Sequence, residues 1–245
     1  MTKKIGVVGE MNERHDPSSC RRILREARED GLSRKLFDEA QDLEDGIYRA
    51  EALCGLCASS EMDEDDRFEW VPIIVNSMIE EERAWRLAES IGIIAKSLGN
   101  WPGGRSRKGL MDDLVAMTGG LPPGEARVDA LRAISNRVSE HKLPELFLLA
   151  IENDGMEAKA VRPVMKAIVS SKNMEMISEI MPLLSEAAPD LAVKFLDNLH
   201  RLSNQYKLKL EPSALQLSLP HLDSADFETV RTLCSHASEI DDVKL

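Results

Sequence analysis

The chain has 245 residues, 43% of them apolar, with 43 acidic against 31 basic side chains and a formal net charge of −12. This composition supports a substantial buried core, and four cysteines in this length do not make a disulfide framework. The negative charge and the 4% aromatic content disfavour binding to nucleic acid or to anionic membranes, so such binding would require a local basic patch.

Residues 1–16 are expected to form an N-terminal tail. Only the stretch KKIGVVGE has strand character, and a lone strand has no sheet to join. The tail lacks the apolar segment and the small-residue cleavage site of a secretory signal, and every apolar run in the chain is shorter than the roughly 18 residues of a membrane span. We therefore expect a cytoplasmic chain without membrane contact.

From residue 17 onward the sequence predicts helices in pairs. Residues 17–45 supply the first pair, and RAEALCGLC at 49–57 then begins a series of similar amphipathic segments. The mean spacing of their apolar anchors is about 35 residues. The segments lie at 49–57, 83–91, 127–135, 161–169, 192–200 and 228–236, with anchors Leu53, Leu87, Leu131, Met165, Leu196 and Val230.

A second helix is expected after each of the first four anchors. Turn signals such as TGGLPPGE and NDGM separate successive pairs. The predicted fold is all-α: one domain over residues 17–245, an α-solenoid or right-handed αα-superhelix of about six to seven antiparallel hairpins with a period of about 34 residues. The second helices are predicted at 68–78, 110–117, 143–151 and 174–184.

The strings RAEALCGLC and RVDALRAIS carry a family resemblance. They are similar to one helix of prokaryotic, especially archaeal, TPR-like or HEAT-like α-helical repeat proteins, and the resemblance covers roughly residues 33–240. No unit has the tryptophan, leucine, glycine and tyrosine pattern of a true TPR, so no partner-binding residue is carried over from that family. The resemblance implies a scaffold or adaptor.

The stretch LGNWPGGRSRKG, at residues 98–109, is predicted to hold an insertion of about ten residues in a hairpin turn, because the interval from Leu87 to Leu131 is longer than the others. Its glycines and cations suit anion or partner binding by Trp101, Arg105, Arg107 and Lys108. A Walker loop is excluded, since Lys108 precedes the glycine and no strand is available. The alternative is a solvated turn.

Cys54 and Cys57 form a C-x-x-C, which suggests zinc or redox chemistry in isolation. Ile91 and Val169 occupy the equivalent position in two other repeats, however, so Cys57 and Cys234 are predicted to be packing residues. Cys234 and His236 are close in sequence but have no further ligands beside them. We expect no metal, no cofactor and no catalytic site, because the five histidines are scattered and no hydrolase or zinc-protease motif occurs.

The acidic run EMDEDDRFEW at 61–70 lacks the glycine and glutamate that an EF-hand loop would need at Phe68 and Ile74. It is predicted to initiate a helix, with an acidic contact for a basic partner as the alternative. Trp70 and Trp85 are expected in the core.

These features together predict a non-catalytic scaffold that binds a protein or peptide partner of unknown identity on its concave face. The alternative is an RNA-binding repeat protein that uses the basic stretch 99–109. Acidity and the absence of recurring base-reading residues stand against that alternative.

Overall fold

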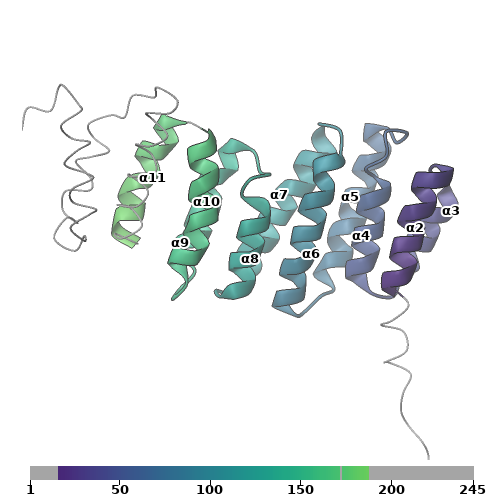
Figure 1. The fold of residues 1–245 in the computed structure, drawn as a ribbon, viewed down its shortest axis with the longest axis horizontal. Coiled ribbons are helices and arrows are strands. Elements are labelled where there is room, and N and C mark those ends of the chain that lie inside the picture. Colours follow the sequence, from purple (N-terminus) through teal and green to yellow (C-terminus); the bar gives the residue numbers. More distant parts are fainter. Residues whose placement is uncertain (1–15, 172, 188–245) are drawn as a thin grey trace, which may run out of the picture. The chain divides into compact units, whose positions relative to one another are not determined.

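The computed structural model of the chain describes residues 16–171 and 173–187 (Figure 1). Within these ranges every regular element is a helix and no strand occurs, which confirms the all-α prediction for the described part. The α-helices are α2 (Asp16–Asp30), α3 (Arg34–Gln41), α4 (Gly46–Leu56), α5 (Glu64–Ile79), α6 (Ala84–Ser97), α7 (Arg105–Gly120), α8 (Glu125–Ile134), α9 (Leu143–Ile151), α10 (Glu157–Ser171) and α11 (Met174–Ala187).

Each helix predicted within the described ranges is present. The segments predicted at 68–78 and 110–117 are longer than expected, as α5 and α7. The tail at 1–15 and the segments at 192–200 and 228–236 lie outside the described residues, and so does Cys234. A single domain over 17–245 therefore stays a prediction.

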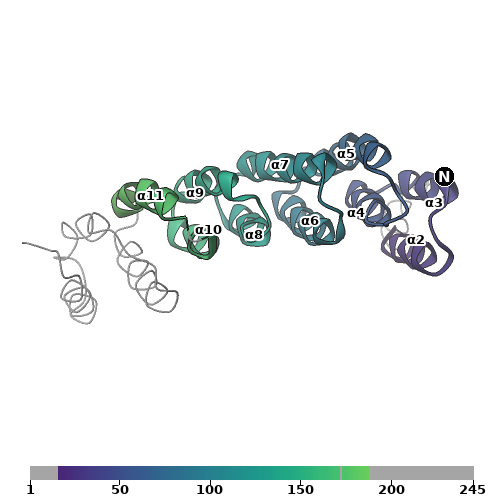
Figure 2. The ribbon, with the colours of Figure 1, turned by 90° about the horizontal axis from the view of Figure 1, so that it is seen from above.

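The chain divides into two compact units, Met1–Arg137 and Val138–Leu245. In the first unit α2 contacts α4, α4 contacts α6, and α6 contacts α8. Figure 2 shows these four helices in one row and α3, α5 and α7 in a second row beside it. Each hairpin of this unit thus contributes one helix to each row.

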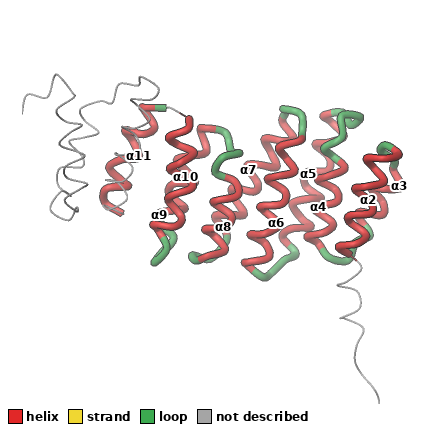
Figure 3. The backbone as a smooth tube through the Cα atoms, viewed as in Figure 1, coloured by secondary structure: helices red, strands yellow, loops and turns green. Residues whose placement is uncertain are grey.

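The second unit is described through α9, α10 and α11, each of which contacts the other two. The side chain of Asn173 begins α11 by accepting a hydrogen bond from the backbone N–H of Met176 at 3.0 Å. Short loops join the helices throughout the described part (Figure 3).

Apolar residues at helical spacing form the core of the first unit. The anchors Leu53 and Leu131 are fully buried, whereas Leu87 is half-buried. Residues one turn later, such as Ile91 and Ile134, are also fully buried. The stripe read from the sequence therefore faces the neighbouring helices, and its burial supplies the main stabilisation of the unit.

Arg49 and Arg127 are the first residues of two of the similar segments, and each stabilises the turn that precedes its helix. Nε of Arg49 donates to the carbonyl of Leu43 at 2.9 Å, and Nε of Arg127 donates to the carbonyl of Leu121 at 3.0 Å. Both carbonyls follow the end of the preceding helix, where carbonyls lack intrahelical partners and the helix dipole favours a cation. These arginines thus serve the fold.

The connection from α6 to α7 is not an enlarged loop. It spans residues 98–104, and residues 57–63 and 135–142 form the corresponding connections from α4 to α5 and from α8 to α9. The prediction of an inserted turn at 99–109 is wrong, because α6 runs to Ser97 and α7 begins already at Arg105. The additional residues lengthen helices instead.

Candidate functional site

Trp101 lies in the core and not on an exposed loop. Its side chain is 2% exposed, and its indole Nε1–H donates to the carbonyl of Cys54 at 3.0 Å. That carbonyl is close to the end of α4, where backbone acceptors need partners from elsewhere in the chain. The prediction that Trp101 contacts a partner is therefore corrected: the residue caps a neighbouring helix.

The three cations predicted beside Trp101 lie in the first turn of α7. Arg105 forms an ion pair with Asp65, and its guanidinium lies 4.6 Å from the ring centre of Phe68. Arg107 Nη1 donates to the carbonyl of Trp101 at 3.4 Å, and Lys108 is exposed. The structure therefore ties two of the three cations to other parts of the same unit.

The N-terminus of α7 already has an anion. The backbone N–H of Ser106 donates to Oε1 of Glu64 at 2.7 Å. This hydrogen bond holds the pKa of Glu64 below its usual value, because it stabilises the carboxylate form. A Cβ added to Gly104 would lie 2.6 Å from the same carboxylate, so the glycine leaves room for it. The anion site that the sequence predicted at this helix N-terminus is therefore occupied by the carboxylate of Glu64 from the same chain.

The acidic run initiates α5, as predicted. Asp63 is the N-cap residue, and its carboxylate accepts a hydrogen bond from the N–H of Asp66 at 2.8 Å. Arg67, in the same run, is 2% exposed and donates from Nε to the carbonyl of Cys57 at 2.8 Å. Sequence reasoning missed this buried arginine, which caps the end of α4 together with Trp101.

Cys54 and Cys57 are both fully buried, which confirms the prediction that Cys57 is a packing residue. Burial raises the pKa of the Cys54 thiol to about 12 and also raises the pKa of Cys57, because a thiolate is poorly solvated in the core. Both side chains are therefore neutral thiols at neutral pH. Thiolates, which metals and disulfide exchange require, do not form readily here.

The tryptophans expected in the core differ from each other. Trp85 is 62% exposed, so its core assignment is wrong, and Arg83 lies over its ring at 5.9 Å. Trp70 is half-buried and stacks on the buried ring of Phe37, with centroids 4.6 Å apart and ring planes at 27°. Trp70 thus packs against Phe37, while part of its side chain stays accessible to solvent.

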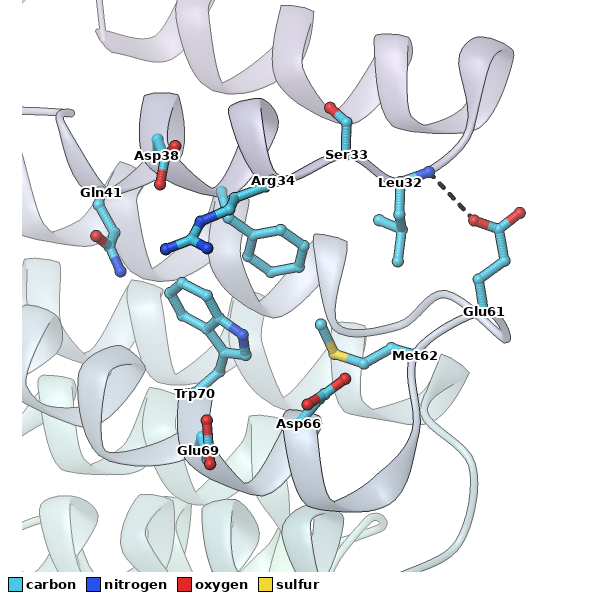
Figure 4. Close-up of a pocket in the computed structure, with 11 residues that line it drawn as sticks. Leu32, Ser33, Arg34, Asp38, Gln41, Glu61, Met62, Asp66, Glu69 and Trp70 are labelled. Atoms are coloured by element: carbon cyan, nitrogen blue, oxygen red, sulfur yellow. Dashed lines mark hydrogen bonds between the residues drawn. The ribbon is translucent and has the colours of Figure 1, made fainter.

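The stacked pair lies in an open pocket of about 550 Å³ in the first unit, which we call the α3–α5 pocket. Figure 4 shows Arg34, Asp38 and Gln41 of α3 on one side, and Asp66, Glu69 and Trp70 of α5 on the other. The lining residues are Leu32, Ser33, Arg34, Phe37, Asp38, Gln41, Glu61, Met62, Asp66, Glu69 and Trp70.

The charge of the α3–α5 pocket is unbalanced. Four carboxylates line it, and Arg34 is the one cationic side chain in the lining. Glu61 is held to the turn after α2, since its Oε2 accepts the backbone N–H of Leu32 at 3.2 Å. A half-buried aromatic wall with excess negative charge suits a cationic ligand. The sequence had indicated Trp70 and the acidic run, but not that α3 faces them.

A second hollow, of about 630 Å³, lies among α2, α4 and α6. Its charged lining residues are Glu51, Arg28 and Lys96, so it carries no excess of negative charge. Burial raises the pKa of Glu51, whereas the charge of Arg21 opposes that shift. This hollow has no aromatic wall. The hollow therefore offers fewer features for ligand selectivity than the α3–α5 pocket, which has both an aromatic wall and an excess of carboxylates.

Within the described ranges, no set of three or more histidine, cysteine, aspartate or glutamate side chains is placed to hold a metal ion. No described helix has both the length and the apolar character needed to cross a bilayer. The chain matches no known family of proteins, no curated protein and no solved structure.

Proposed function

We propose that the chain is a non-catalytic, cytoplasmic α-solenoid scaffold, of the TPR-like or HEAT-like kind, that binds a protein or peptide partner without a cofactor. The observation that carries the proposal is the α3–α5 pocket, because it combines an aromatic wall, excess carboxylates and an open mouth. Stacked helix pairs of the kind seen in the first unit present extended surfaces for partners. The solenoid arrangement and the number of repeats are themselves part of the proposal.

The placement of the arginines disfavours RNA as the partner. Arg49 and Arg127 are engaged with backbone carbonyls, and Arg105 is paired with Asp65. Binding to RNA depends on cations that neutralise phosphates and on aromatic faces that stack with bases. At the α3–α5 pocket, the first unit instead presents carboxylates beside the half-buried ring of Trp70.

Affinity capture of the full chain from its native host, with and without nuclease, tests the proposal. We expect a protein to be enriched to the same extent in both samples. Enrichment that nuclease abolishes would favour the RNA-binding alternative and refute the proposal.

A further inference from the structure

A three-part arrangement recurs in the first unit: an aromatic ring, an arginine guanidinium lying over it, and a carboxylate that pairs with that arginine. The guanidinium lies between 4.6 and 6.0 Å from the ring centre. The four sets are Tyr48 with Arg86 and Asp45, Phe68 with Arg105 and Asp65, Trp85 with Arg83 and Glu81, and Trp101 with Arg67 and Glu64.

The α3–α5 pocket has two of these three parts. The stacked rings of Phe37 and Trp70 supply the aromatic surface, and Asp66 and Glu69 are exposed carboxylates in the lining. Among the described residues, no guanidinium lies over either ring, and neither carboxylate belongs to an ion pair. The missing part is a cation that lies over the ring and pairs with a carboxylate, because Arg34 lines the pocket without doing either.

We propose that an arginine side chain of a partner peptide occupies the α3–α5 pocket, stacks on Trp70 and pairs with Asp66 and Glu69. The inference rests on the proposed function and specifies the chemistry of its partner. A planar guanidinium can stack on an aromatic face and donate two parallel hydrogen bonds to a carboxylate, which an ammonium group cannot do. The pocket volume of about 550 Å³ lies within the range of sites that bind small ligands.

Arg34 is the neighbour that could compete with the partner's arginine. It is exposed and lines the same pocket, but it makes no ring contact or ion pair within the described part of the chain. Its charge repels an incoming cation. The variant Arg34→Ala is therefore expected to bind an arginine peptide more tightly. Loss of binding in this variant would overturn the proposal, because it would show that Arg34 supports binding of the arginine peptide and does not compete with it.

The test is a titration of the full ¹⁵N-labelled chain with acetyl-Gly-Arg-Gly-amide, followed through the indole N–H signal of Trp70. The variant Trp70→Phe assigns that signal by its loss. We expect a saturable shift with a dissociation constant in the range of about 1 mM, which corresponds to about 4 kcal/mol. The lysine peptide should bind more weakly, and the glutamate peptide should leave the signal unmoved. An unmoved signal with the arginine peptide, or equal shifts with all three peptides, would overturn the proposal.

Matched variants separate the pocket from general electrostatics. The double variant Asp66→Asn, Glu69→Gln should weaken binding of the arginine peptide about tenfold, or about 1.4 kcal/mol. Asp65→Asn removes the same kind of charge from the same helix outside the pocket lining, so it should change affinity less than about twofold. Equal weakening by Asp65→Asn and by the double variant would overturn the proposal. Thermal melting verifies that each variant is folded.

Failure of the pocket and failure of the proposed function give different results. If affinity capture recovers the same protein with the double variant as with the native chain, the partner binds elsewhere and the pocket assignment is wrong, while the scaffold function stands. If the peptide titration succeeds but capture recovers no protein, the pocket chemistry stands and the scaffold function loses its support.

Discussion

Removing the carboxylate of Glu64 should loosen the contact between α5 and α7. Glu64 accepts the N–H of Ser106 at 2.7 Å and lies 3.4 Å from Nη1 of Arg67. The variant Glu64→Ala therefore removes the cap of α7 together with one partner of Arg67. Glu64→Gln keeps a hydrogen-bond acceptor but removes the charge. Comparison of the two variants separates the capping contribution from the electrostatic one.

The magnitude follows from these contacts. Loss of a capping acceptor costs about 0.5–2 kcal/mol, and the charge at a helix N-terminus contributes about 0.3–1 kcal/mol. The side chain of Glu64 is 35% exposed, so solvent screens part of the charge, and Arg67 keeps its carbonyl acceptors. We expect a loss of about 1–2 kcal/mol for Glu64→Ala and about half of that for Glu64→Gln.

The pH dependence gives a second measurement. The pKa of Glu64 is lower in the folded chain than its ordinary value of 4.5, so its stabilising contribution is complete above that pH and is lost as pH falls through the folded pKa. The difference in unfolding free energy between the native chain and Glu64→Gln should therefore shrink as the pH falls below the ordinary pKa of 4.5 and through the lower folded pKa.

Urea unfolding measures both effects, as a lower midpoint with an unchanged slope. Glu69→Gln serves as the control, because Glu69 is exposed on the same helix and belongs to no ion pair in the described part of the chain. If Glu64→Ala is as stable as this control, or if the difference for Glu64→Gln does not change with pH, the capping role of Glu64 is refuted.

Three further predictions concern stability. Gly104→Ala should cost about 1 kcal/mol in the native background, because its Cβ displaces the Glu64 carboxylate, but much less in Glu64→Ala; equal costs in both backgrounds would exclude the coupling. Without denaturant, a thiol reagent should label Cys54 only as fast as the unit opens, because the thiol is buried and protonated. Its labelling rate should therefore be far below the rate measured in urea, and equally fast labelling in both conditions would contradict its burial. Trp101→Phe should destabilise the chain by about 1–3 kcal/mol, because it leaves the carbonyl of Cys54 unpaired, whereas Trp85→Ala should change stability by less than about 0.5 kcal/mol; the reverse order in urea unfolding would contradict their assigned environments.

The positions of helices were predictable because hydrophobic spacing reports which face of a helix is buried. Leu53 and Leu131 illustrate this, as both were read as anchors and both are fully buried. Helix ends were less predictable. The glycines before Arg105 suggested a long loop, but Glu64 caps α7 across the unit, and a contact between residues so far apart leaves no local signal.

The environments of the tryptophans show the same limit. Trp85 has helical spacing and apolar neighbours in the sequence, yet it lies on the exposed face of α6. Trp101 lies in a glycine-rich stretch of the sequence, yet it is buried. The α3–α5 pocket could be found only in part, because the acidic run and Trp70 were visible in the sequence while the pairing of Trp70 with Phe37 depends on how α3 meets α5. The local sequence pattern predicts which face of a helix is apolar. Which segment of the chain packs against that face depends on tertiary contacts, which the pattern does not contain.

Hydrogen exchange of the full chain, measured with and without its captured protein partner, tests the central claim most directly. Partner binding at the α3–α5 pocket should slow exchange in peptides covering residues 31–41 and 61–72 more than in those covering α7 and α8. Protection confined to the basic first turn of α7, or absent from both walls of the pocket, would contradict the claim that this pocket receives the partner.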